Sequence, residues 1–96
     1  MEPNRFALRR RALQVLDALA PEEQKQVLDK LEALGKLPRE QWPMHEFSRL
    51  PGEEPLYLLR IPPRLRLFVR MDDGSQPEVL DIVHRDRLAA FASSKT

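Results

Sequence analysis

Apolar residues near the start of the chain recur every three or four positions. Leu8, Ala12, Val15, Leu16 and Leu19 fall on one helical face, and this spacing is typical of an amphipathic helix that packs on a core. A second helical pattern follows almost directly, with only Ala20 and Pro21 in between. Because so short a connection turns the chain back, the pattern predicts an antiparallel helical hairpin.

The second helix is expected from Pro21 to Gly35. Proline suits the first position of a helix, where its missing N–H is not needed. Glu22 and Glu23 then suit the positive end of the helix dipole, and a glycine commonly follows the last turn. Its apolar stripe consists of Val27, Leu28, Leu31 and Leu34.

Three later segments have the character of strands: Leu56–Ile61, Leu65–Met71 and Glu78–Val83. Pro62-Pro63 ends the first, and Asp72-Asp73-Gly74 is a strong turn signal after the second. The spacing predicts an antiparallel meander. Alternation along its middle strand puts Leu65, Leu67, Val69 and Met71 on one face and Arg66, Phe68 and Arg70 on the other.

The remaining segments contribute shorter elements. Arg5–Leu8 is either a strand or an extended lead-in, Glu46–Arg49 is a candidate short strand, and His84–Ala92 can form a short closing helix. Trp42 is expected to cap the core. We therefore predict an α+β fold in which an N-terminal antiparallel helical hairpin packs on a three- to four-stranded antiparallel sheet. The core should include Leu16, Leu28, Leu31, Leu67, Val69 and Ile82.

Length and composition narrow the class of protein. With 96 residues, the chain has the length of one domain, which we expect to span residues 1–96. The absence of cysteine excludes disulfides and thiolate metal sites and fits a cytoplasmic protein. No apolar run approaches the length of a membrane span, so no membrane association is expected.

The net charge of +1 conceals an uneven distribution of charge. Four arginines and no acidic residue lie between Arg60 and Arg70, and Arg85 follows the last strand. Guanidinium groups bind phosphate in a bidentate manner, so a rim of these arginines favours RNA or another polyanion. The equally weighted alternative is a solvated sheet face, neutralised by Glu78 or Asp81. The five arginines are Arg60, Arg64, Arg66, Arg70 and Arg85.

Other chemistry has little support in the sequence. His84 could act as a general acid or base, or lie at a strand end without a catalytic role. His45 and His84 are the only histidines and do not have metal-ligand spacing, and the three glycines form no nucleotide-binding loop. We therefore expect neither a metal nor a cofactor.

Several strings, in their order and spacing, resemble the RelE/ParE superfamily of bacterial toxin–antitoxin toxins over nearly the whole chain. They are Ala-Pro-Glu-Glu (20–23), His-Glu-Phe-Ser-Arg-Leu (45–50), Leu-Tyr-Leu-Leu-Arg-Ile (56–61), Arg-Leu-Arg-Leu-Phe-Val-Arg (64–70) and Val-Leu-Asp-Ile-Val-His-Arg (79–85). The resemblance implies a cytoplasmic toxin silenced by a cognate antitoxin. For the RelE branch it also implies a ribosome-dependent endoribonuclease that cleaves messenger RNA without a metal.

The resemblance also implies roles for individual residues. Arg60, Arg66 and Arg85 match basic positions of the RelE branch that stabilise charge while a ribose 2′-hydroxyl attacks the adjacent phosphate. Leu58 stands where a second basic residue is expected, and Phe91 stands where several ribonucleases have a tyrosine. Phenylalanine keeps base stacking but cannot transfer a proton, so His84 could supply that function. Arg64, Arg70 and Phe91 are the further candidate RNA-binding residues.

Two other functions stay open at this point. The ParE branch shares the fold and poisons DNA gyrase without cleaving RNA, and the lack of a tyrosine at Phe91 favours it somewhat. A degenerate interaction domain that retains only the scaffold is the third possibility. The expected partners are accordingly an antitoxin together with the ribosome and mRNA, or with DNA gyrase.

Overall fold

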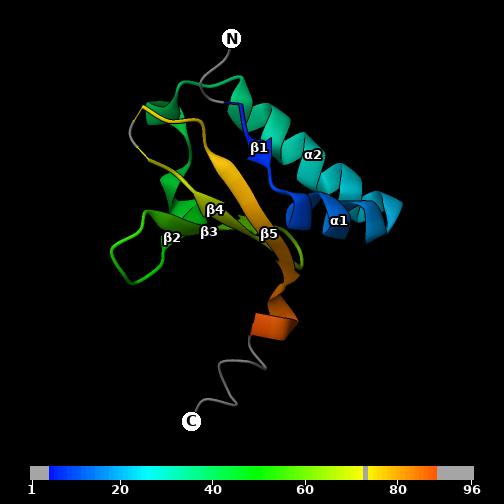
Figure 1. Ribbon diagram of the computed structural model, residues 1–96. Coiled ribbons are helices and arrows are strands. Elements are labelled where there is room, and N and C mark those ends of the chain that lie inside the picture. The colour runs from blue at the N-terminus through cyan, green and yellow to red at the C-terminus, as the bar shows by residue number, and fades with distance from the viewer. Residues whose placement is uncertain (1–4, 73, 89–96) are drawn as a thin grey trace.

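A mixed five-stranded sheet forms the centre of the molecule, with strand order β1-β5-β4-β3-β2 (Figure 1). The computed structural model describes residues 5–72 and 74–88. The strands are β1 (Ala7–Leu8), β2 (Phe47–Arg49), β3 (Leu56–Ile61), β4 (Leu65–Arg70) and β5 (Glu78–His84). The predicted meander is confirmed, since β3 pairs antiparallel with β4 and β4 pairs antiparallel with β5.

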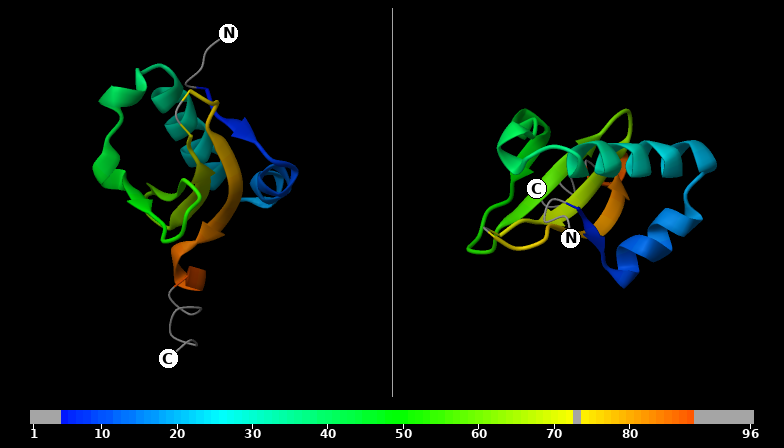
Figure 2. Two further views of the ribbon diagram at one scale, coloured as in Figure 1. Left: turned by 60° about the vertical axis from the view of Figure 1, so that its left-hand side comes forward. Right: turned by 90° about the horizontal axis from the view of Figure 1, so that it is seen from above.

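Two helices cover one face of this sheet. They are α1 (Arg10–Ala18) and α2 (Pro21–Gly35), and they diverge from their short connection as they cross the sheet (Figure 2). Pro21 begins α2, with Glu22 and Glu23 in its first turn, so the predicted start of this helix is confirmed. Two 3₁₀ turns, η1 (Arg39–Gln41) and η2 (Met44–Glu46), lead from α2 to β2.

Strand β1 differs from the sequence prediction. It runs parallel to β5, with Ala7 opposite Glu78 and Leu8 opposite Val79, so the sheet is mixed and not purely antiparallel. Its backbone hydrogen bonds have ordinary lengths: the Ala7 N–H donates to Pro77 O at 2.9 Å, and the Arg9 N–H donates to Val79 O at 3.0 Å. Two residues are too few to show a period of two, and the partner strand lies far along the chain.

A register shift between Phe68 and Val69 sets the faces of β5. Phe68 pairs with Asp81 but Val69 pairs with Val79, so Leu80 is the extra residue of a β-bulge. Val79 and Ile82 are three positions apart and would face opposite sides of a regular strand. With the bulge, both are buried, at 0% and 3% exposure.

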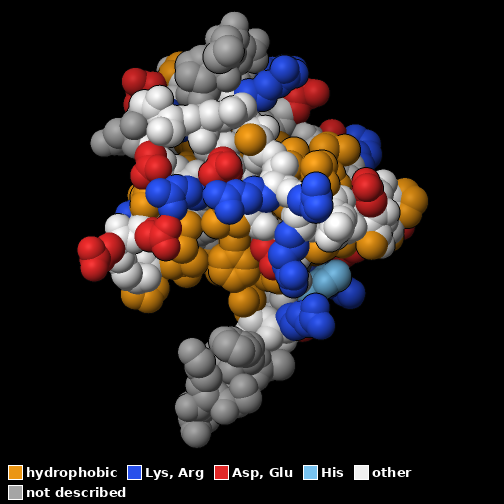
Figure 3. Space-filling view, in the orientation of Figure 1, with side chains coloured by type: hydrophobic (Ala, Val, Ile, Leu, Met, Phe, Trp, Pro, Cys, Tyr) orange, Lys and Arg blue, Asp and Glu red, His pale blue; other side chains and the backbone are white. Residues whose placement is uncertain are grey.

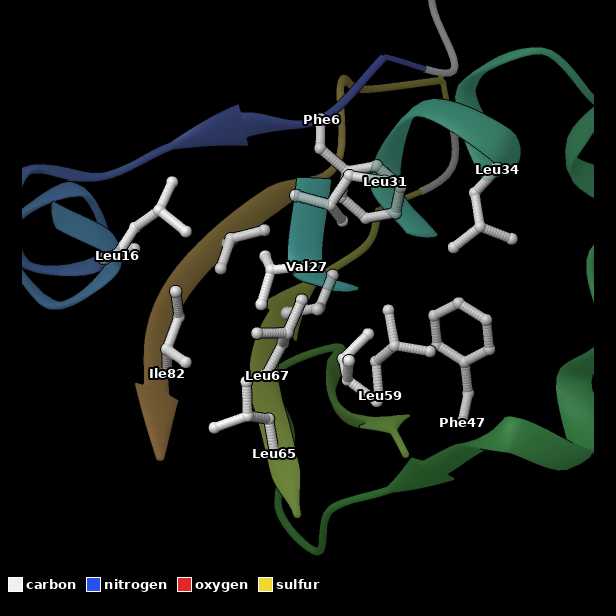
Figure 4. Close-up of a cluster of buried hydrophobic side chains, with 14 of the residues drawn as sticks. Phe6, Leu16, Val27, Leu31, Leu34, Phe47, Leu59, Leu65, Leu67 and Ile82 are labelled. Atoms are coloured by element: carbon white, nitrogen blue, oxygen red, sulfur yellow. The ribbon is translucent and has the colours of Figure 1, made fainter. Parts of the chain in front are cut away.

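The core lies between the helices and the inner face of the sheet (Figure 4). Five of the six residues predicted to share it are buried: Leu16, Leu31, Leu67, Val69 and Ile82. Leu28 was predicted wrongly, because its side chain is 49% exposed. Helix α2 buries Val27, Leu31 and Leu34. Leu28 follows Val27 and is therefore rotated about 100° from it around the helix axis, toward solvent.

Trp42 caps the core as expected. Its ring lies between those of Phe6 and Phe47, with centroids 5.2 and 5.8 Å away. Its Nε1–H donates to Leu34 O at 2.8 Å, which satisfies the one polar group that the buried indole carries.

The predicted closing helix is described only in part. Residues 85–88 are helical, and the rest of the expected segment, including Phe91, lies outside the described residues. Within the part of the chain that the structure describes, no helix is long and apolar enough to cross a membrane.

Candidate nucleic-acid interface

Arg60 and Arg66 lie directly opposite each other on neighbouring strands. Directly opposed residues share a face of the sheet, with Cβ atoms about 5 Å apart. Their neighbours Leu59, Ile61, Leu65 and Leu67 point inward, with exposures of 0 to 2%. The two arginines therefore leave the outer face of the sheet, as alternation along β4 predicted.

Arg85 completes a group of three interacting cations. It follows β5 directly, and its backbone N–H donates to Arg64 O at 2.7 Å. Burial first, and then the positive charges of Arg60 and Arg85, lower the pKa of the Arg66 guanidinium. Because like charges close together disfavour the charged state, an anion bound among these three residues would relieve their repulsion. We call Arg60, Arg66 and Arg85 the arginine cluster.

The acids expected to neutralise this face are paired elsewhere. Glu78 accepts from Arg9 at 3.3 Å, and Asp81 accepts from Arg11 at 2.9 Å. Among the described residues, no carboxylate forms an ion pair with Arg60 or Arg66, and Arg66 Nη1 donates to the neighbouring carbonyl of Leu65 at 2.8 Å. Arg85 has only a 3.6 Å contact with the adjacent Asp86. Most of the positive charge of the arginine cluster is thus available to a ligand.

Arg70 lies apart from the arginine cluster. Four residues along a strand span about 13 Å, so Arg70 and Arg66 share a face without converging. Arg70 Nη1 donates to Glu54 at 2.6 Å, and its Nε lies 3.3 Å from Asp72. The hydrogen bond that Arg70 donates to Glu54, together with the charges of both acids, raises the pKa of Arg70. The single rim of five arginines predicted from sequence is therefore not formed.

His84 belongs to the other side of the sheet. It pairs in register with Leu65, whose side chain is fully buried on the helix-covered face. Its Nε2 lies 3.2 Å from Glu23 Oε2 on α2, beside an open groove of about 510 Å³ that Arg64 and Gln26 also line. The structure thus places His84 and Arg64 at the end of the sheet, on the opposite side from Arg66.

Figure 3 shows basic side chains gathered at the end of β5, with hydrophobic side chains nearby on the same side of the molecule. Two residues that adjoin the candidate site residues in the structure were not assigned to the site from the sequence. Glu23 contacts His84 from 61 positions away, and no sequence signal marks that contact. Phe68 was assigned to the correct face by alternation, but was given no function. In the described ranges, no group of three His, Asp or Glu residues is arranged to hold a metal ion.

Comparisons with solved structures identify the fold. A chain of the toxin–antitoxin complex RelBE2 from Mycobacterium tuberculosis matches with a TM-score of 0.68 and 25% identity, over 88% of this chain and 94% of that one. A chain of the archaeal RelE–RelB complex from Pyrococcus horikoshii OT3 matches with a TM-score of 0.66 and 18% identity, over 88% and 98%. No protein-family model and no curated protein matches the chain.

A third similar structure is protein HP0894 from Helicobacter pylori, with a TM-score of 0.59 and 16% identity over 86% of this chain and 96% of that one. The chain therefore has a RelE-like α+β fold. Together with the strings noted in the sequence, the likeness to the RelBE2 chain supports a place in the RelE-like toxin superfamily.

Proposed function

We propose that this protein is the toxin of a toxin–antitoxin pair and that it cleaves messenger RNA on the ribosome. The observation that carries the proposal is the direct pairing of Arg60 with Arg66, next to Arg85, without a carboxylate partner for the first two among the described residues. On a solvent-exposed sheet face, an arginine is stabilised by an acidic residue directly opposite it on the next strand and destabilised by another arginine there. Here the cross-strand neighbours repel each other instead, which favours an anionic ligand.

The arginine cluster would act by stabilising charge. When a ribose 2′-oxygen attacks the adjacent phosphorus, the bond from phosphorus to the 5′-oxygen breaks and extra negative charge develops on the phosphoryl oxygens. Guanidinium groups offer paired donors to such oxygens. His84, our candidate for proton transfer, lies on the opposite face of the sheet from Arg66. It would therefore exchange protons with the 2′-hydroxyl and the leaving 5′-oxygen through water and not by direct contact. Arg64, at the β3–β4 turn, lines the same groove as His84.

We further propose that a cognate antitoxin binds this chain and silences it. Two of the similar structures are toxin–antitoxin complexes, and the match covers most of the chain. The test is copurification of the tagged chain with the product of a neighbouring gene that encodes a small acidic protein. Recovery of the chain alone, while that product is present and unbound, would count against an antitoxin.

A second function, poisoning of DNA gyrase, has one observation in its favour. His84 and the Arg60–Arg66 pair lie on opposite faces of the sheet, and the acid nearest to Arg66 in register on the outer face, Asp81, is held by Arg11 at 2.9 Å. A binding protein needs the positive surface but not the proton transfer. Experiment therefore has to distinguish RNA cleavage from gyrase poisoning.

The experiment expresses three forms of the chain in bacterial cells and maps the 5′ ends of transcripts. The wild type should arrest growth and produce new cuts in phase with codons. Arg66→Gln should remove these cuts, because it deletes one charge of the arginine cluster while keeping a side chain of similar length. Arg70→Gln is the matched control, since Arg70 lies on the same face of the same strand but is paired with Glu54 and Asp72.

A different outcome of the same experiment would contradict the ribonuclease proposal. If the wild type arrests growth without codon-phased cuts while gyrase-linked DNA breaks accumulate, the ribonuclease proposal is wrong and the gyrase function replaces it.

A further inference from the structure

Phe68 stands apart from the other aromatic residues that the structure describes. Phe6, Trp42, Phe47 and Tyr57 form a continuous set of ring contacts, and two of them also face an arginine. In residues 5–72 and 74–88, neither a ring nor a guanidinium lies against Phe68. Its side chain is half-buried on the outer face of β4.

The register puts Phe68 next to the arginine cluster. It lies two residues from Arg66 along β4, a distance of about 7 Å between Cα atoms, on the same face. Its direct cross-strand partners are Leu58 and Asp81, and Arg60 is a diagonal neighbour. Diagonal neighbours are within reach of aromatic and long side chains. Phe68 thus shares a sheet face with two neighbouring arginines, Arg60 and Arg66, that have no carboxylate partner in the described residues.

We infer that Phe68 is a stacking platform for one base of a single-stranded RNA whose backbone phosphate lies on the arginine cluster. This inference rests on the proposed function, and adds a substrate-positioning residue to it. Single-stranded RNA is commonly held by aromatic rings on a sheet face together with basic side chains that follow the backbone. Successive phosphates and their bases are separated by distances of the order found between Arg66 and Phe68 here.

The charge around Phe68 favours RNA over an apolar protein segment as its occupant. An apolar helix would place its side chains over Arg60 and Arg66 and bury two cations without partners, which is costly. A nucleotide brings a phosphate to those cations and a π-face to the ring. Asp81, the nearest acid in register, is held by Arg11 at 2.9 Å, so its charge is partly offset.

The experiment measures the affinity of the purified chain for a single-stranded 2′-O-methyl RNA, about ten nucleotides long, over a series of salt concentrations. The methyl group prevents cleavage. Phe68→Leu should weaken binding by about 5- to 150-fold, which is the range for the loss of one stacked base. The slope of log affinity against log salt should not change, because no phosphate contact is lost.

Two further variants, Arg66→Gln and Leu58→Ala, should affect RNA binding differently from Phe68→Leu. The arginine variant should make the salt slope shallower by about 0.7, the value for one phosphate contact with a single strand. Leu58→Ala removes apolar area directly beside Phe68, but should change affinity by less than about twofold, because a stacked base needs the π-face. Melting temperatures of all variants show whether each still folds.

A Phe68→Trp variant tests the stacking role by a gain of signal, which a misfolded protein would not give. Phe68→Trp should bind at least as tightly as the wild type, and RNA should quench its fluorescence. Trp42 is only 4% exposed, so it contributes a background that RNA does not reach. An RNA with an abasic ribose at the stacked position should bind the wild type and Phe68→Leu equally.

Three results would overturn the inference. Binding that Phe68→Leu leaves unchanged would remove Phe68 from the RNA site while leaving the proposed function intact. An equal loss for Leu58→Ala and Phe68→Leu, with no effect of the abasic site, would show that the face takes an apolar protein partner. Absence of RNA binding by the wild type at every salt concentration would overturn the inference, whereas cleavage on programmed ribosomes decides the proposed function separately.

Discussion

Arg66 and Arg70 leave the same face of the same strand, and their surroundings give them opposite electrostatic environments. Arg66 faces Arg60 across the β3–β4 pair, and its pKa is lowered by burial and by the charges of Arg60 and Arg85. Arg70 is held by Glu54 and Asp72, and its pKa is raised, chiefly by the hydrogen bond with Glu54. The positive charge of Arg66 therefore works against the folded state, whereas that of Arg70 works for it.

The two arginines should differ in their effect on stability. Arg66→Gln relieves a like-charge contact and should leave the melting temperature unchanged or raise it. Arg70→Gln breaks two ion pairs and should lower it modestly. Thermal unfolding followed by circular dichroism measures both, and the difference should shrink at high salt because exposed charges are screened. A clear loss of stability in Arg66→Gln would show that this arginine serves the fold.

A second pair of residues tests the packing of helix α2. Leu31 is 7% exposed and Leu28 is 49% exposed. Leu31→Ala should cost about 2–5 kcal/mol of unfolding free energy, as buried leucines do. Leu28→Ala should cost less than about 1 kcal/mol. Urea unfolding of both variants compares them directly, and equal losses would mean that Leu28 is also part of the buried stripe in solution.

At the scale of secondary-structure elements, most of the fold could be predicted from the sequence. The helices and the β3–β4–β5 meander were predictable because periods of 3.6 and 2 persist over enough residues to be recognised. The direction of β1 was not predictable, since two residues show no period and the pairing joins distant parts of the chain. The bulge at Leu80 was also not predictable, because the register shift between β4 and β5 and the burial of both Val79 and Ile82 are properties of the folded sheet.

The pairing of β1 with β5 predicts a pattern of amide hydrogen exchange. In a parallel pair, alternate residues of an edge strand donate to the neighbour, and here Ala7 and Arg9 donate to Pro77 and Val79. The amides of Ala7 and Arg9 should therefore exchange more slowly than that of Leu8. Exchange measured by NMR checks this order. Rapid exchange at all three would show that β1 does not pair stably with β5.

At the scale of the whole molecule, the helices occupy one side of the sheet (Figures 1 and 2). The strand register places the arginine cluster on the other side. Alternation predicted that Arg66 would lie on the outer face. It could not predict that Arg70 pairs with Glu54, or that α1 supplies Arg11 to Asp81, because ion pairs between distant segments depend on how the elements dock. For the same reason, the separation of His84 from Arg66 became visible only in the register of β4 and β5.

The measurement that tests the central claim most directly is single-turnover cleavage of a messenger RNA on purified, programmed ribosomes. Wild type, Arg66→Gln and Arg70→Gln are compared at saturating enzyme. Removing one donor from a preorganised charge-stabilising site slows a reaction by about a hundredfold or more, so we expect Arg66→Gln to be slower by about that factor. Arg70→Gln should cleave at close to the wild-type rate. Equal rates for all three forms, or no cleavage by the wild type, would contradict the assignment of the arginine cluster as the site of RNA cleavage.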